Sequence, residues 1–257
     1  MRIRVRLFAL QRELAGTREI ALELFSLTDG VFMSLKKDAL GNTGGLITLD
    51  DPAWAEAIRA RLLVSEGIPS AGGLAGRDLE SLTVALGEML DEGYLAHRVA
   101  STGRLGEQLA AAGVPVVTPF GAHAIYVNGR AFCPHLPNEQ LPAWSLSVAL
   151  YVHSGVRTWE TGNVMQGRHD PATGAWQWPD LDLLRLAVPR RVFTLSQLKY
   201  AVDRIVWLYE NRNLIGGLRF VEEPKMLRFF FGKLKPVGGD WGTKVVEAFQ
   251  KDFGKEL

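Results

Sequence analysis

Short apolar runs alternate with longer segments of helical periodicity along this chain of 257 residues, and this alternation constrains the fold more than any other feature. The short runs have the length and the turn-forming flanks of buried strands, whereas apolar residues three and four apart indicate amphipathic helices. The predicted strands are residues 30–34, 44–49, 114–119, 122–128, 156–161, 182–189 and 218–223. The predicted helices are residues 18–25, 53–64, 79–90, 93–112, 142–155 and 195–212. The alternation predicts an α/β first part and an α+β second part.

Two helix starts are marked by the residues that precede them. Asp51 followed by Pro52 is typical of a cap and a first helical turn, and Thr194 occupies the same capping position before residues 195–212. We place the domain boundary near residue 92. The predicted units are residues 1–92, residues 93–237, and an appended tail at 238–257 that ends in an amphipathic helix.

Composition excludes several classes of protein. Lys and Arg total 29 and Asp and Glu total 28, so a nucleic-acid or anionic-membrane partner is not expected. The single cysteine, Cys133, allows no internal disulfide and fits a reducing compartment. No apolar run approaches the ~20 residues of a membrane helix, and the basic start "MRIRVRLFAL" lacks a cleavage site. The histidines and the cysteine show no metal-ligand spacing. We expect a cytoplasmic protein.

Lys36 and Lys37 lie where a predicted buried strand meets a glycine-rich turn, "GNTGG". A solvated strand end is the common interpretation of such a pair. Three features favour another: α/β sheets bind ligands at strand ends, Ser34 could face the same pocket as Lys37, and the glycines let backbone approach a ligand. A partly desolvated lysine beside another cation has a lowered pKa and can form a Schiff base. On spacing alone, both interpretations stay open.

Arg185 stands between Leu184 and Leu186 inside a predicted strand. A guanidinium in an apolar strand is costly unless it is paired. One interpretation is a structural bridge to Asp180 or Asp182. The other is a bidentate grip on the carboxylate of a substrate, which the planar guanidinium suits well.

The segment "FSLTDGVFMSLKKDALGNTGGLITL" closely resembles the cofactor-lysine segment of the tryptophanase and tyrosine phenol-lyase family, whose members are fold-type I enzymes that use pyridoxal phosphate. The resemblance continues in order through "EGIPSAGGLAGRDLE", "AGVPVVTPFGAHAIYV", "FCPHLPNEQLPAWSLSVALY", "LLRLAVPRRVFT" and "GLRFVEEPKMLRFF", from about residue 17 to about residue 235. It implies an α/β fold: the C-terminal part of a fold-type I pyridoxal-phosphate-dependent transferase, with the end of the large domain followed by an α+β small domain.

The resemblance also implies roles for individual residues. It places the cofactor lysine at Lys37, a phosphate contact at Ser34, and the backbone of Asn42 where the family binds a monovalent cation such as K⁺. Arg185 falls at the arginine that holds the substrate carboxylate. The implied reaction is β-elimination from an aromatic L-amino acid such as tryptophan or tyrosine, which releases pyruvate, ammonia and the aromatic group.

Four positions depart from the family pattern. Phe229 stands where tryptophanases carry histidine and agrees with the phenol-lyases, whereas Thr161 stands where phenol-lyases carry an arginine that helps phenol to leave. Ala71 replaces a family tyrosine, and Leu35 replaces a small residue before the lysines. Both Thr161 and Phe229 are therefore expected to bear on the substrate, and the departures allow a different β-substituent.

The family also has a long segment before the matched region. In the family, that segment carries the phosphate cradle, the aromatic residue that stacks on the cofactor ring and the aspartate that pairs with its nitrogen. We therefore expect a separate chain to supply an N-terminal half, which makes a split enzyme and a hetero- or homo-oligomer. The alternative is a truncated, inactive remnant.

Overall fold

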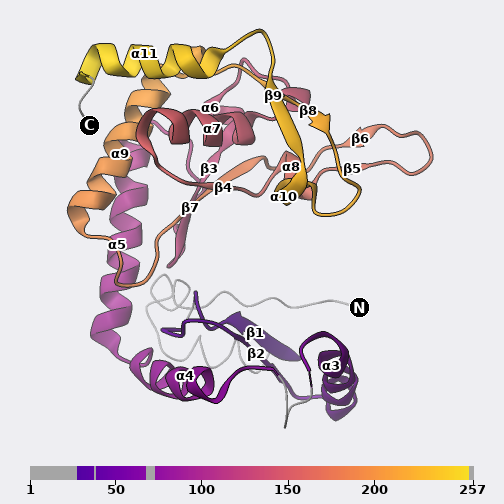
Figure 1. Cartoon of the computed structure of the whole chain (residues 1–257). Helices are drawn as coiled ribbons and strands as arrows, with labels where there is room; N and C mark the ends of the chain where they lie inside the picture. The colour runs from indigo at the N-terminus through magenta and orange to yellow at the C-terminus, as the bar shows by residue number, and fades with distance from the viewer. Residues whose placement is uncertain (1–27, 38, 68–72, 255–257) are drawn as a thin grey trace. The chain divides into compact units, whose positions relative to one another are not determined.

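The computed structural model describes residues 28–37, 39–67 and 73–254 (Figure 1). The predicted helix at residues 18–25 and the departure at Ala71 lie outside these residues. Contacts divide the chain into two compact units, Met1–Ser101 with Gly121–His123, and Thr102–Phe120 with Ala124–Leu257. We describe each unit by itself.

The first unit begins with an antiparallel hairpin followed by helices. Its elements are β1 (Gly30–Ser34), β2 (Gly45–Leu49), α3 (Pro52–Ser65), α4 (Gly76–Glu88) and the first part of α5 (Glu92–Ala111). The hairpin register runs from Gly30 opposite Leu49 to Ser34 opposite Gly45. The Asp51 carboxylate accepts the backbone N–H groups of Ala53 and Trp54 at 2.7 and 3.2 Å, which confirms the predicted start of α3.

Among the residues that the structure describes, the first unit has a buried apolar cluster of Leu35, Ala39 and Leu82, with three partly buried residues against it. The glycine-rich turn packs on this core: a Cβ at Gly41 would collide with Leu82, and Gly44 adopts a φ of +87°. Helix α3 buries none of its residues. The glycine-rich turn that follows the lysines is thus packed against a buried apolar cluster.

The second unit is built on a three-stranded antiparallel sheet. Its order is β3 (Ala124–Asn128), β7 (Leu183–Ala187), β4 (Trp159–Glu160), so the strand that comes last in sequence lies in the middle. The other elements are α6 (Gly129–Phe132), η1 (Asn138–Gln140), α7 (Pro142–Ser154), α8 (Asn163–Gln166), β5 (Arg168–His169), β6 (Trp176–Gln177), α9 (Leu195–Glu210), η2 (Arg212–Leu214), β8 (Leu218–Glu222), α10 (Arg228–Phe231), β9 (Lys233–Pro236) and α11 (Trp241–Phe253). The pairs β5–β6 and β8–β9 form two further antiparallel hairpins (Figure 1).

A large core joins this sheet to the helices. The fully buried members include Leu109 of α5, Ile125 and Val127 of β3, Leu146 of α7, Leu184 of β7, and Ile205 and Leu208 of α9. Thr194 caps the start of α9, as the sequence predicted, and Gln197 completes a reciprocal capping box with it.

Helix α11 belongs to the segment that the sequence suggested to be an appended tail. It contributes Trp241, Val245 and Phe249 to the core of the second unit, and Trp241 Nε1 donates to the Gly217 carbonyl at 3.0 Å. No helix in the described part of the chain is both long and apolar enough to cross a bilayer.

Candidate active site

The first group of predicted site residues forms a lysine turn, which we define as Ser34, Leu35, Lys36 and Lys37. Ser34 ends β1, and the chain folds back so that the Lys37 N–H donates to the Ser34 carbonyl at 3.0 Å. The same turn brings Lys37 Nζ to 3.5 Å from Ser34 Oγ. The two side chains predicted to share a pocket therefore lie side by side, with Lys37 half-buried and Lys36 exposed.

The lysine turn is fixed by contacts from helices of the same unit. The buried Arg98 of α5 donates to the Lys37 carbonyl at 3.1 Å. The Leu35 side chain, which replaces a small residue of the family, is buried in the core of the unit. Asn42 is exposed, and its amide donates to Asp78 of α4 at 3.1 Å. The backbone of the turn is thus held on both sides of Lys37.

The second group lies on the three-stranded sheet of the second unit. Arg185 is on the central strand, directly opposite Tyr126 of β3 on one side and Trp159 of β4 on the other. Directly opposite residues share a face of a sheet, and the neighbours Leu184 and Leu186 point into the core, so the row of three faces away from the core. This row is half-buried.

Thr161 and Phe229 reach the same face through Trp159. The Thr161 N–H donates to the Leu183 carbonyl at 2.8 Å, two residues beyond Trp159 on the strand. The ring of Phe229 meets Trp159 edge-on, with centroids 6.2 Å apart and planes at 78°. We call Tyr126, Trp159, Thr161, Arg185 and Phe229 the arginine face.

The structural alternative for Arg185 is not supported. Asp182 is fully buried and accepts the N–H groups of Ala143 and Asn163, each at 2.8 Å. Asp180 offers its backbone carbonyl to Arg130 at 3.0 Å. Within the residues that the structure describes, no hydrogen bond or ion pair reaches the Arg185 guanidinium. A half-buried guanidinium in that state is suited to a carboxylate ligand.

A buried pair of carboxylates lies behind the arginine face. Glu160 is 2% exposed, and burial raises its pKa to about 7, with the nearby Asp182 adding to the rise. Burial also raises the pKa of Asp182. A Cβ at Gly162 would collide with Asp182, so the chain here has room only for glycine. These acids organise the backbone around β4.

The buried thiol of Cys133 is disfavoured as a nucleophile. Burial raises the pKa of Cys133 to about 12, which leaves a thiol without nucleophilic character. No cluster of three or more metal-ligating side chains occurs among the described residues.

Sequence reasoning missed four residues around the arginine face. Tyr126 and Trp159 flank Arg185, and Glu160 and Arg228 hold the backbone next to it. Alternation along "VRTWET" was a usable signal, because it places Trp159 and Thr161 on one side of the strand. For Arg228 the sequence contains no comparable signal, since the Val164 and Gly167 carbonyls and the Trp176 ring that it contacts are distant in sequence.

Comparison with known proteins identifies the family. A family profile described as beta-eliminating lyase matches residues 13–203. This chain belongs to the beta-eliminating lyase family. It is 48% identical over 221 residues to a tryptophanase of Salinibacter ruber, covering 86% of this chain and 46% of that protein. It is 44% identical over 220 residues to a tyrosine phenol-lyase of Symbiobacterium sp., covering 86% of this chain and 48% of that protein.

The beta-eliminating lyase chain spans about half the length of these curated relatives. A solved serine palmitoyltransferase of Sphingomonas wittichii matches 75% of this chain and 42% of its own at a TM-score of 0.48 and 16% identity. The fold assignment therefore rests on the family. Membership confirms the predicted resemblance and the predicted fold class, part of a fold-type I pyridoxal-phosphate enzyme.

The lysine turn fits the cofactor of such enzymes in its chemistry. Lys37 offers a primary amine that can condense with an aldehyde, and the adjacent Ser34 hydroxyl can donate to a phosphate oxygen. Lys36 adds a positive charge next to them. Pyridoxal phosphate is thus supported by the family and is compatible with the side chains present.

Proposed function

We propose that this chain provides the lysine-bearing and carboxylate-binding part of a pyridoxal-phosphate-dependent β-eliminating lyase. Its substrate would be an aromatic L-amino acid such as tryptophan or tyrosine. The observation that carries the proposal is the pairing of Lys37 Nζ with Ser34 Oγ at the end of β1 in a member of this family. The net reaction consumes one water and yields pyruvate, ammonia and the protonated aromatic group.

Each side chain has one task in this proposal. Pyridoxal phosphate, when bound, supplies an electron sink for the carbon that loses its proton. Lys37 Nζ would hold the cofactor, and its free amine would take the proton from the substrate Cα. Ser34 Oγ donates to the phosphate. Arg185 binds the substrate carboxylate through two parallel hydrogen bonds, which fixes the orientation of the Cα–H bond.

The leaving group would lie against the aromatic part of the arginine face. Phe229 and Trp159 present ring edges and faces that suit a planar substituent. Thr161 supplies a hydroxyl that is small and neutral, where a phenol-releasing enzyme of this family carries a cation. The aromatic rings of Phe229 and Trp159, together with the neutral Thr161, therefore favour an aromatic leaving group without a strong requirement for a phenolate.

A separate chain would supply the N-terminal half of the enzyme, and the assembly would be oligomeric. This part of the proposal is motivated by the share of the relatives that the chain spans. The backbone near Asn42 would bind a monovalent cation such as K⁺, as the resemblance implies.

The adjacent lysines provide a matched pair of variants. The chain would be co-expressed with a polypeptide that covers the N-terminal half of a relative, loaded with pyridoxal phosphate, reduced with borohydride and mapped by peptide mass. We expect the label on Lys37. Lys37→Arg should abolish the label and lower pyruvate release by at least 10²-fold, an estimate based on the size of proton-transfer catalysis, whereas Lys36→Arg should retain both. Label on Lys36, or unchanged turnover in Lys37→Arg, would contradict the proposal.

The second candidate is a folded remnant without activity. It is favoured by Thr161 in place of the family arginine and by Ala71 in place of the family tyrosine. It predicts that the loaded assembly neither takes up label nor releases pyruvate from any amino acid. Measurable turnover that depends on Lys37 would exclude it.

A further inference from the structure

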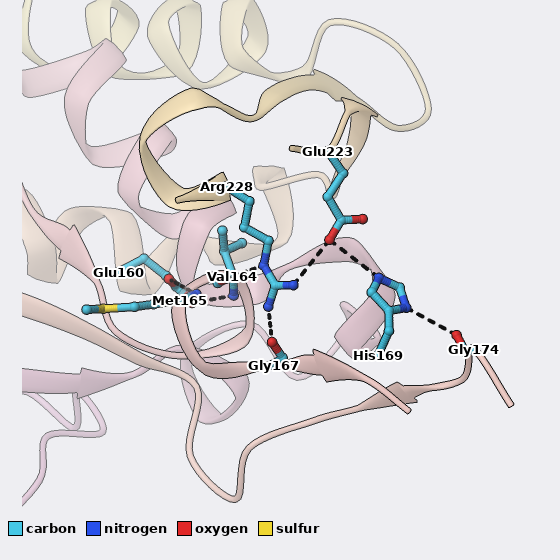
Figure 2. A network of polar contacts seen from close by, with 8 residues as sticks. All are labelled: Glu160, Val164, Met165, Gly167, His169, Gly174, Glu223 and Arg228. Carbon is cyan, nitrogen blue, oxygen red and sulfur yellow. Dashed lines mark hydrogen bonds and ion pairs between the residues drawn. The ribbon is translucent and has the colours of Figure 1, made fainter. Parts of the chain in front are cut away.

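Side chains form hydrogen bonds with both ends of a single helical turn next to the arginine face. At its N-terminal end, the Glu160 carboxylate accepts the N–H groups of Gly162, Val164 and Met165 at 2.8, 2.9 and 3.1 Å. This turn is α8, and Figure 2 shows the carboxylate directed at its backbone. The N–H groups that a short helix leaves unpaired are thereby satisfied.

At the C-terminal end, Arg228 holds the carbonyl groups. Its Nε donates to the Val164 carbonyl at 2.6 Å, and a terminal nitrogen donates to the Gly167 carbonyl (Figure 2). The other terminal nitrogen lies 3.2 Å from Glu223, and the guanidinium stacks 4.7 Å from the ring centroid of Trp176. A guanidinium engaged in this way, with its side chain only 16% exposed, is fixed in position.

Glu160 and Arg228, which hold this turn, are sequence neighbours of the residues proposed to contact the substrate. Glu160 stands between Trp159 and Thr161, and Arg228 immediately precedes Phe229. Through α8, Arg228 therefore ties the segment that carries Phe229 to the strand that carries Trp159. Both belong to the second unit.

We propose that Arg228 is a positioning residue that holds Phe229 against Trp159, and that the aromatic wall so formed beside Arg185 selects planar aromatic leaving groups. The proposal deepens the function proposed above and rests on it. A substrate whose leaving group is a small thiolate, such as S-methyl-L-cysteine, needs no aromatic wall. Displacing the rings of the aromatic wall should therefore lower kcat/KM for the aromatic substrate and not for the thiolate-releasing one.

The test uses Arg228→Lys, which keeps the charge but loses the fork that reaches two carbonyls and Glu223. Arg219→Lys is the matched control, because Arg219 is exposed on β8. The full chain is labelled with 5-fluorotryptophan, and the Trp159 resonance is assigned with Trp159→Phe. We expect the Trp159 and Trp176 resonances to shift in Arg228→Lys and to stay in place in Arg219→Lys.

In the loaded assembly, the ratio of kcat/KM for tryptophan or tyrosine to that for S-methyl-L-cysteine should fall about threefold to tenfold in Arg228→Lys, as expected for a lost aromatic pair. It should not change in Arg219→Lys. If Arg228→Lys fails to fold, Glu223→Gln removes one support of the guanidinium and should give a smaller change in the same direction.

An unmoved Trp159 resonance would overturn the positioning role, and an unchanged ratio in an active assembly would overturn the selection. Failure of the proposed function is recognised separately. In that case the unmutated assembly turns over neither substrate, and the proposed selection of leaving groups is refuted as well. The Trp159 resonance still tests whether Arg228 positions the aromatic wall.

Discussion

At the scale of single residues, the buried acid Glu160 has the clearest physical consequence. Its carboxylate accepts three N–H groups, which favour ionisation, yet burial outweighs them and raises its pKa to about 7 from 4.5. The folded protein thus holds this proton more tightly than the unfolded chain does. At a pH between 4.5 and about 7, unfolding therefore releases the proton of Glu160.

This linkage predicts a pH-dependent stability. Because the folded state binds the extra proton, the free energy of unfolding falls as pH rises from about 4.5 to about 7 and levels off above it. The penalty at neutral pH is roughly 3 kcal/mol for a shift of this size. Glu160→Gln should remove this pH dependence, so the free energy of unfolding of the variant should increase relative to that of the parent as pH rises. Urea unfolding between pH 4.5 and 8 measures the difference.

The exposed acid Glu247 of α11 provides a matched Glu→Gln substitution away from the buried carboxylates. Titrating groups that do not interact with Glu160, including His153, whose pKa is lowered by burial, contribute equally to parent and variants and cancel in the comparison. Asp182 is coupled to Glu160, so the measured difference belongs to this pair of carboxyl groups. Parallel curves for Glu160→Gln and the parent would contradict the assignment of a proton to Glu160.

The sequence predicted the lysine turn and the strand position of Arg185, and the structure places Lys37 beside Ser34. Their chemical roles stay predictions. The sequence could not predict the partners of Asp182, which looked like an ion-pair partner for Arg185 but accepts N–H groups from Ala143 and Asn163. Those donors become neighbours only when the chain folds.

At the scale of elements, helix α5 contains two glycines with opposite surroundings. A Cβ at Gly103 would meet no atom within 4 Å among the residues that the structure describes, whereas a Cβ at Gly106 would lie 2.6 Å from the Phe120 ring. The same substitution therefore separates helix propensity from packing within one helix.

Gly103→Ala should stabilise the protein by about 0.5–1 kcal/mol, because alanine loses less backbone entropy in a helix. Gly106→Ala gains the same entropic stabilisation but must displace the Phe120 ring. Overpacking of that kind costs roughly 1–3 kcal/mol of stability. Thermal unfolding of both variants measures the difference. A stabilised Gly106→Ala would show that the ring yields without cost.

The elements found from sequence are those with strong local signals. Helices α3 and α9 have caps at Asp51 and Thr194, and their side chains make the expected bonds. The hairpin β5–β6 and the turn α8 were missed, because two-residue strands and one-turn helices are too short to show periodicity. Their positions depend on tertiary contacts such as those of Arg228.

At the scale of the whole molecule, the two units differ in how much apolar surface they bury. Among the described residues of the first unit, the buried apolar cluster has three members, and Phe32, Val64 and Leu90 are 78, 87 and 74% exposed. The second has a large continuous core. Local stability follows the density of buried apolar contacts, so the units should open at different rates.

Limited proteolysis should detect this difference. At a low trypsin ratio we expect the earliest cuts at Arg59 and Arg61 of α3, a helix that buries none of its residues. A fragment containing the second unit should persist. Mass spectrometry of the early fragments identifies the sites, and first cuts between residues 124 and 253 would contradict the prediction.

The order of strands in the second unit also has a consequence for protein synthesis. β3 and β4 both pair with β7, which leaves the ribosome after them. Until residues 183–187 are translated, Ile125 and Val127 lack the strand that completes their sheet. The nascent chain is therefore a natural client for a chaperone during that interval, and slow codons shortly before β7 would lengthen it.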